Sequence, residues 1–147
     1  MGLRRSRGFT LIEMMVVVAI IGLLATLILP RVLGRQEQAQ VEKAKADIQA
    51  LSSAVKLYKL DNFNYPSTQQ GLQALLTKPS GDPPANNWKQ GGYIERLPKD
   101  PWGNDYQYLS PGQHGDYDIW SYGSDGKPGG QGTAADIGNW DSNATSG

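Results

Sequence analysis

The sequence predicts an α+β protein in which one long N-terminal helix precedes a small antiparallel sheet. Residues 9–29 are almost uniformly apolar, and apolar residues then recur every three or four positions as far as residue 58. The second half holds most of the 18 glycines and 9 prolines, together with short aromatic and apolar runs typical of strands. A long helix should therefore lead into a loop-rich region with a few short strands.

The apolar segment has the length of a membrane-spanning helix. Its 21 residues, from Phe9 to Leu29, would form a helix about 32 Å long, against a bilayer core of roughly 30 Å. Three arginines before it place the N-terminus in the cytoplasm by the positive-inside rule. The segment is longer than the apolar region of a secretory signal, and no A-x-A-like site follows it. We therefore expect residues 9–30 to remain as a single membrane anchor, with the rest of the chain on the far side.

An amphipathic segment follows the anchor and predicts a continuation of the same helix, over residues 10–60. Pro30 weakens the joint because it cannot donate a hydrogen bond to the carbonyl of Thr26. One stripe beyond this joint is apolar at spacings of 3, 4, 3, 4 and 3, while charged residues occupy the other faces. The stripe, which we expect to pack on a core, is formed by Val41, Ala44, Ile48, Leu51, Val55 and Tyr58.

The segments after the long helix are short. Ser67 or Thr68 can cap a short helix over residues 69–77, and the two clearest strands cover residues 106–109 and 117–122. From Gly123 onward the chain is rich in glycine.

Composition and motifs argue against several classes of function. Residues 9–147 carry 11 basic and 14 acidic residues, so no basic surface for nucleic acid is expected. Cysteine is absent, which excludes disulfides and thiolate metal sites. His114 is the only histidine and has no partner nucleophile in sequence motifs. Asp116 and Asp118 would share one face of a strand, where we expect them to be solvated rather than catalytic. The protein is not expected to be an enzyme.

The N-terminal motif resembles a known processing signal. A short basic leader ends in Gly8 and is followed by Phe9, Thr10, Glu13 and an apolar run that ends at Pro30. This arrangement resembles the class III signal of type IV pilins and type II secretion pseudopilins. The resemblance implies that a prepilin peptidase removes residues 1–8 by cleavage after Gly8 and then N-methylates Phe9.

Motifs further along the chain resemble the major pseudopilins of type II secretion in particular. They lie at residues 58–62, 65–75, 92–94, 97–98, 100–103, 122–126 and 136–140. The resemblance covers essentially the whole chain and implies a type IV pilin-like fold, with residues 31–147 forming a periplasmic domain. The absence of cysteine separates the chain from pilins that close a C-terminal loop with a disulfide.

Glu13 is an acidic residue inside the apolar segment. A charged side chain at the centre of a membrane helix costs roughly 2.5–3.5 kcal/mol, and less towards an end. No Lys or Arg lies between Phe9 and Leu29, so the expected partner is the α-amino group that cleavage creates on Phe9 of a neighbouring subunit. The alternative is that Glu13 extends to the lipid headgroups. Thr10 either caps the helix or takes part in assembly.

The glycine-rich C-terminal segment is a candidate calcium site, and the alternative is a solvated acidic loop. Asp125 and Asp136 are eleven positions apart, but Lys127 stands where an EF-hand needs an acidic residue. Calcium takes six to eight oxygen ligands, and backbone carbonyls of a glycine-rich loop can supply several of them. Major pseudopilins bind calcium in this segment, and the resemblance implies the Asp125 and Asp136 side chains as ligands, assisted by the carbonyls of Tyr122 and Lys127. Ala135 stands where some relatives carry a second aspartate.

The resulting expectation is a structural subunit of the type II secretion pseudopilus. It would begin as a single-pass protein of the bacterial inner membrane and polymerise into a periplasmic filament that drives export of folded proteins. The resemblance implies as partners further copies of the chain, minor pseudopilins, the prepilin peptidase, an inner-membrane assembly platform and an outer-membrane secretin channel. Two alternatives remain: a type IV pilin subunit, and a monomeric membrane-anchored calcium-binding module that recognises a partner or a glycan.

Overall fold

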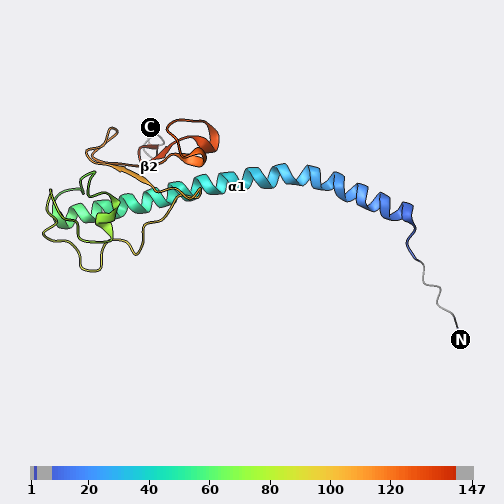
Figure 1. Ribbon diagram of the computed structural model, residues 1–147, viewed down its shortest axis with the longest axis horizontal. Helices are drawn as coiled ribbons and strands as arrows, with labels where there is room; N and C mark the ends of the chain where they lie inside the picture. The colour runs from blue at the N-terminus through green and yellow to red at the C-terminus, as the bar shows by residue number, and fades with distance from the viewer. Residues whose placement is uncertain (1, 3–7, 142–147) are drawn as a thin grey trace. The chain divides into compact units, whose positions relative to one another are not determined.

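The computed structural model describes residue 2 and residues 8–141, without the side chains of residues 28–33. The chain forms two compact units, Met1–Glu37 and Gln38–Gly147, and a single helix passes through both. Figure 1 shows this helix, α1. The three leader arginines, Arg4, Arg5 and Arg7, lie outside the described residues.

Helix α1 covers Leu11–Asn62, which confirms the long helix predicted over residues 10–60. It continues past Pro30 without a break, although the side chain of Pro30 is not among those described. The helix ends where the Asn62 side chain donates a hydrogen bond to the carbonyl of Tyr58, over 3.0 Å. Phe63, the next residue, adopts a left-handed conformation that an α-helix cannot continue.

In the first unit, residues 11–27 of α1 are exposed on every side of the helix. No described residue of the unit covers these side chains, which include leucine, isoleucine, valine and methionine. Across the residues with described side chains, no helix is both long enough and apolar enough to cross a membrane. The membrane-spanning role of residues 9–30 stays a prediction.

In the second unit, α1 packs through the predicted apolar stripe. Five of the six stripe residues are buried, and Val41 is half-buried against the same core. Burying a side chain of this kind contributes about 1.5–3 kcal/mol, so the stripe fixes which face of the helix meets the domain. The core also includes Leu75, Tyr106, Tyr117 and Ile119.

A three-stranded antiparallel sheet lies in the second unit, in the order β1-β2-β3. Strands β1 (Gln107–Leu109) and β2 (Asp118–Ser121) confirm the two predicted strands, with slightly shorter bounds. Tyr108 pairs with Ile119 across them. Strand β3 (Ile137–Gly138) has only two residues, too few for a periodic pattern, and its position was predicted only as glycine-rich tail. Asn139, directly after β3, accepts a hydrogen bond from the Ile119 N–H over 3.0 Å and so holds it against β2.

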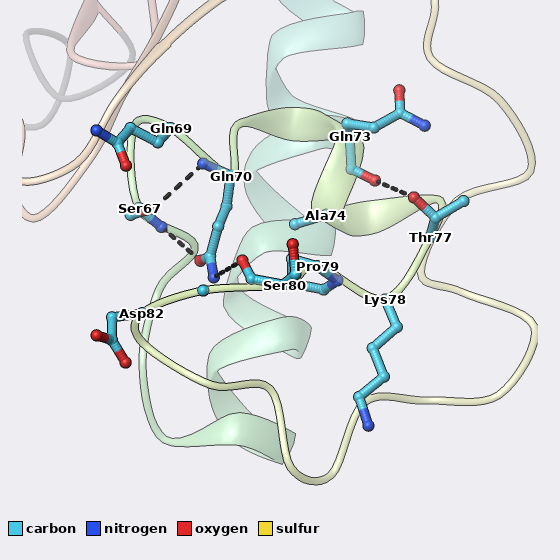
Figure 2. A pocket seen from close by; sticks show the side chains of 11 residues that line it. Ser67, Gln69, Gln70, Gln73, Ala74, Thr77, Lys78, Pro79, Ser80 and Asp82 are labelled. Atoms are coloured by element: carbon cyan, nitrogen blue, oxygen red, sulfur yellow. Dashed lines mark hydrogen bonds between the residues drawn. The ribbon is translucent and has the colours of Figure 1, made fainter.

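The helix predicted over residues 69–77 is wrong in type and length. The structure forms only a short 3-10 helix, η1 (Leu72–Leu75). Gly71 has a φ of 61°, which an α-helix cannot contain, so the helix begins after it. The predicted cap by Ser67 or Thr68 is wrong as well, because the N-cap residue of η1 is Gly71 and no side chain caps it. The Ser67 hydroxyl instead accepts the Gln70 N–H over 3.2 Å, in the turn before η1. In the other direction, the side-chain oxygen of Gln70 accepts the Ser67 N–H over 2.9 Å (Figure 2).

Candidate functional site

The N-terminus of α1 is closed by a reciprocal pair of hydrogen bonds. The Thr10 hydroxyl accepts the N–H of Glu13 over 3.2 Å, and the Glu13 carboxylate accepts the N–H of Thr10 over 3.4 Å. This arrangement is a capping box, which satisfies two N–H groups that a helix start leaves without partners. It confirms the capping role considered for Thr10.

The capping box corrects the expectation that Glu13 has no partner in its own helix. That expectation counted only lysine and arginine and missed the Thr-x-x-Glu spacing at the helix start. The bond uses one oxygen of the carboxylate, and a carboxylate can accept several hydrogen bonds. Glu13 can therefore hold the cap and still face a cation from outside the chain.

The predicted processing site lies just before the helix. Gly8 and Phe9 precede α1, and both residues are exposed. A Cβ atom at Gly8 would meet nothing within 4 Å, so the backbone is open on that side. The structure therefore leaves the Gly8–Phe9 bond accessible to an enzyme.

The predicted calcium ligands lie in a loop segment, residues 122–136, that contains two short 3-10 helices, η2 (Gly123–Asp125) and η3 (Gly132–Ala134). Asp125 ends η2, and Asp136 follows η3. The Asp125 carboxylate accepts the Lys127 N–H over 3.1 Å. The Asp136 carboxylate reaches back to the Gly129 N–H, with both oxygens at 3.1 Å. Both carboxylates are thus folded onto residues 125–129 of the same loop.

Backbone carbonyls of the segment around η3 approach the start of η2. Gly123 has a φ of 77°, and a Cβ atom there would lie 2.6 Å from the Thr133 carbonyl oxygen and 2.7 Å from that of Ala135. A side chain would block this approach, so glycine is needed at position 123. The carbonyls of Thr133 and Ala135 are candidate ligands that the sequence analysis missed. The signal for them was the glycine spacing, which marks where backbone segments meet.

The donor set of the loop suits a hard cation that takes oxygen ligands. Within the described part of the chain, no three His, Cys, Asp or Glu side chains form a group that could hold a metal ion. Two carboxylates with several carbonyls remain, and calcium accepts such a mixture. The predicted carbonyl donor Tyr122 lies directly before η2, and Lys127 lies two residues after its end, in the same loop segment.

A buried carboxylate anchors the start of η2. Asp100 is 4% exposed, and one of its oxygens accepts the backbone N–H groups of Trp102 and Asn104, over 3.1 and 2.8 Å. Its other oxygen accepts the Ser121 hydroxyl over 2.7 Å. The Ser121 hydroxyl in turn accepts the Gly123 N–H over 3.1 Å. The sequence analysis did not single out Asp100, which stabilises the loop from outside it.

The expectation that Asp116 and Asp118 are both solvated is wrong for Asp118. Asp118 is 2% exposed and accepts the backbone N–H groups of Gln113 and His114, over 2.8 and 3.2 Å. The 111–117 loop closes over it through Gly112, where a Cβ atom would lie 2.6 Å from the Asp118 carboxylate. Asp116 is exposed, as expected.

His114 belongs to the same structural cluster. Its Nδ1 lies 3.0 Å from the Asp118 carboxylate, and its ring stacks on Trp140 with 3.9 Å between the centroids. These contacts join the 111–117 loop to the residues that follow β3. They are one polar contact and one ring-stacking contact between segments of the same unit.

A polar hollow of about 440 Å³ beside η1 contains no grouped charges (Figure 2). Gln70 braces it, because its side-chain amide donates to the carbonyls of Ser80 and Pro83 over 3.2 and 2.9 Å. Lys78 and Asp82, the charged residues of its lining, are drawn apart from one another in Figure 2.

Comparisons with known proteins agree with the sequence motifs. The family model described as type II secretion system (T2SS), protein G, matches residues 31–140, and a prokaryotic N-terminal methylation motif matches residues 3–29. A type II secretion system core protein G of Pseudomonas aeruginosa is 59% identical over 94% of this chain and 97% of the relative. One of Vibrio cholerae is 58% identical over 94% of each chain.

A solved structure is similar as well. The crystal structure of the major pseudopilin from the type 2 secretion system of enterohaemorrhagic Escherichia coli matches with a TM-score of 0.66. The two chains are 50% identical, and the match covers 74% of this chain and 93% of the other.

Proposed function

Because the chain belongs to the protein G family of the type II secretion system, we propose that it works as a major structural subunit of the pseudopilus. The observation that carries this proposal is the helix over residues 11–27, which is apolar and exposed on every side. Such a surface is unfavourable in water and must be covered by lipid or by other helices. A filament built from copies of the chain would cover it.

Processing would prepare this helix for assembly. A prepilin peptidase would cleave after Gly8 and N-methylate Phe9, and the match to the methylation motif over residues 3–29 supports this step. The exposure of Gly8 and Phe9 supports it too. Before assembly, residues 9–30 would span the inner membrane, with residues 31–147 in the periplasm.

Glu13 would set the register between neighbouring subunits. Its carboxylate would pair with the α-amino group of Phe9 from the adjacent copy, while the bond to the Thr10 N–H keeps the side chain at the helix start. Away from water, a charge without a partner is costly. An incoming subunit in the wrong register would leave such a charge unpaired and would therefore be disfavoured.

The assembled filament would act mechanically. Helix α1 of each copy would lie at the centre, and the domain of residues 38–147 would coat it. Growth at the membrane, on the assembly platform and driven by a cytoplasmic ATPase, would push folded proteins through the secretin channel. Minor pseudopilins would join the same filament. The family relationship supports these partners.

Calcium would hold the C-terminal loop in place. The Asp125 and Asp136 carboxylates and the carbonyls of Tyr122, Lys127 and Thr133 would supply its oxygen ligands. The close approach of the Thr133 carbonyl to Gly123 supports a compact loop segment at this place. The ion would replace the disulfide that this cysteine-free chain cannot form.

Intact-mass measurement of the full chain purified from membranes tests the proposed function. We expect a chain that begins at N-methylated Phe9, together with filaments in the sheared fraction of the cells. A chain that still begins at Met1 and remains monomeric would instead favour the membrane-anchored recognition module.

A further inference from the structure

Three large apolar side chains lie exposed at the C-terminal end of α1. Leu57, Leu60 and Phe63 are 51%, 72% and 76% exposed. Across the described residues from 38 to 141, they are the exposed large hydrophobic side chains. We call them the helix-end patch. The other large apolar side chains described in this unit are buried or partly buried, so the patch is not a general feature of this domain.

The helix-end patch continues a stripe of small exposed residues along α1. Ala46, Ala50 and Ser53 are exposed and precede Leu57 and Leu60 at spacings of 4, 3, 4 and 3. These spacings place the side chains on one face of the helix. The buried stripe, which includes Leu51 and Val55, lies on another face. Helix α1 therefore has two apolar faces in this unit, and its own domain covers only one of them.

Phe63 supplies an independent observation. It is the first residue after α1, has a φ of 65°, and donates its N–H to the Lys59 carbonyl over 2.7 Å. Helices often end on such a left-handed residue, but the residue is usually glycine or asparagine, and a bulky one is an outlier there. Glycine would form the same bond without steric cost. The fold gives no reason for an aromatic ring at this position, where most of the ring contacts water.

We propose that the helix-end patch binds a second copy of this chain, through the exposed apolar part of α1 at residues 11–27. The proposal rests on the proposed function, in which copies assemble through this helix. The patch lies on the same helix as the assembly segment, so one interface would extend along α1. Residues 11–27 of a neighbour offer apolar side chains on every side and one charge, at Glu13.

The stripe and its border suit a helix as the bound element. Small side chains such as Ala46 and Ala50 allow two helix backbones to approach closely. Leu57, Leu60 and Phe63 would then provide the large apolar contacts at one end. The exposed lysines 56 and 59 border the patch, as polar residues border the apolar centre of many interfaces.

A substitution at Phe63 separates a role in the interface from a role in the fold. Phe63→Asn removes the ring but keeps a residue that tolerates the left-handed conformation. In the full chain in detergent we expect an unchanged or higher Tm, because strain is relieved. In cells with the secretion machinery we expect the yield of sheared filaments to fall about tenfold, the effect of losing one central interface side chain.

Two further variants complete the comparison. Leu60→Lys places a charge in the patch and should likewise reduce filaments with little change in Tm, whereas Lys89→Asn, at an exposed position outside α1, should change neither. Filament yield at the wild-type level in Phe63→Asn and Leu60→Lys would overturn the inference. So would a fall in Tm that matches the loss of filaments. Absence of filaments from the wild-type chain would count against the proposed function instead.

Photo-cross-linking identifies what covers the patch. A benzoylphenylalanine at position 63 keeps an aromatic ring and reacts with its nearest neighbour on illumination. In assembled filaments we expect an adduct with twice the mass of the mature chain, with the cross-link within residues 11–27 of the second copy. An adduct with another protein, with lipid, or with a different part of the second copy would overturn the inference.

Discussion

The two ends of helix α1 differ in what stabilises them. Over residues 11–27 every side chain is exposed, whereas from Gln38 to Asn62 one face is buried in a core of the same chain. The second region also bonds to its domain, since the Tyr106 hydroxyl donates to the Asp47 carboxylate over 2.8 Å. In the first region, the side-chain hydrogen bonds of the described residues stay within the helix and its cap, such as the bond from the Thr26 hydroxyl to the Leu23 carbonyl. The region from Gln38 to Asn62 is packed within its own chain, whereas the apolar surface of residues 11–27 needs a cover from outside the chain.

A matched pair of leucine substitutions should separate the two regions most strongly. Leu51→Ala leaves a cavity in the core, and we expect it to lower the free energy of unfolding by about 2–5 kcal/mol. Leu24→Ala changes an exposed side chain, so its effect on the isolated chain should stay within about 0.5 kcal/mol. Chemical denaturation of the full chain in detergent measures both. Equal losses would mean that residues 11–27 already have a packed environment within one chain.

Removal of calcium should affect only the second region. An ion present at a hundredfold excess over its dissociation constant stabilises the folded state by about 2.7 kcal/mol. We therefore expect a chelator, or Asp125→Ala, to lower the Tm of the domain and to leave the helix signal of residues 11–27 unchanged. If metal-loaded wild-type protein and Asp125→Ala melt at the same temperature, with and without chelator, the loop holds no stabilising ion.

Asp116 and Asp118 provide a test of how the 111–117 loop is stabilised. Asp118→Ala would leave the N–H groups of Gln113 and His114 without their acceptor, and an unsatisfied buried group costs about 1–3 kcal/mol. Asp116→Ala is the control, because that side chain is exposed and its loss should be almost neutral. Similar effects of the two substitutions on the denaturation midpoint would argue that Asp118 is solvated after all.

High pH should lower the stability of the second region through two of its tyrosines. Burial, followed by the hydrogen bond to Asp47, raises the pKa of Tyr106 above its usual value, and burial raises the pKa of Tyr108. Below about pH 10 these two tyrosines are protonated in both the folded and the unfolded chain, so they add no pH dependence to the stability. Above it the unfolded chain loses these protons first, so stability should fall as pH rises. Tyr106→Phe should flatten this decline in denaturation curves between about pH 9 and pH 11, and an unchanged slope would exclude Tyr106 as its cause.

The long helix and its buried stripe could be predicted from the sequence because many residues repeat one pattern. Asp118 could not, since its burial depends on the 111–117 loop, whose path is set by Gly112 rather than by any periodicity. Strand β3 was missed for a similar reason: its two residues pair with β2 only after the intervening loop has folded. At the helix start, the Thr-x-x-Glu spacing of Thr10 and Glu13 is itself the signal for the capping box. A search for oppositely charged partners alone does not find it.

The capping box makes one measurement decisive for the subunit joint. Glutamine in place of Glu13 can still accept the Thr10 N–H, so Glu13→Gln keeps the cap and removes only the charge. Thr10→Ala does the reverse, since it removes the hydroxyl that caps the Glu13 N–H and retains the carboxylate. Filament yield from full chains carrying each substitution therefore separates charge pairing from capping. We expect Glu13→Gln to abolish filaments and Thr10→Ala to retain most of them; wild-type filament yield from Glu13→Gln would contradict the pairing of Glu13 with the neighbouring amine.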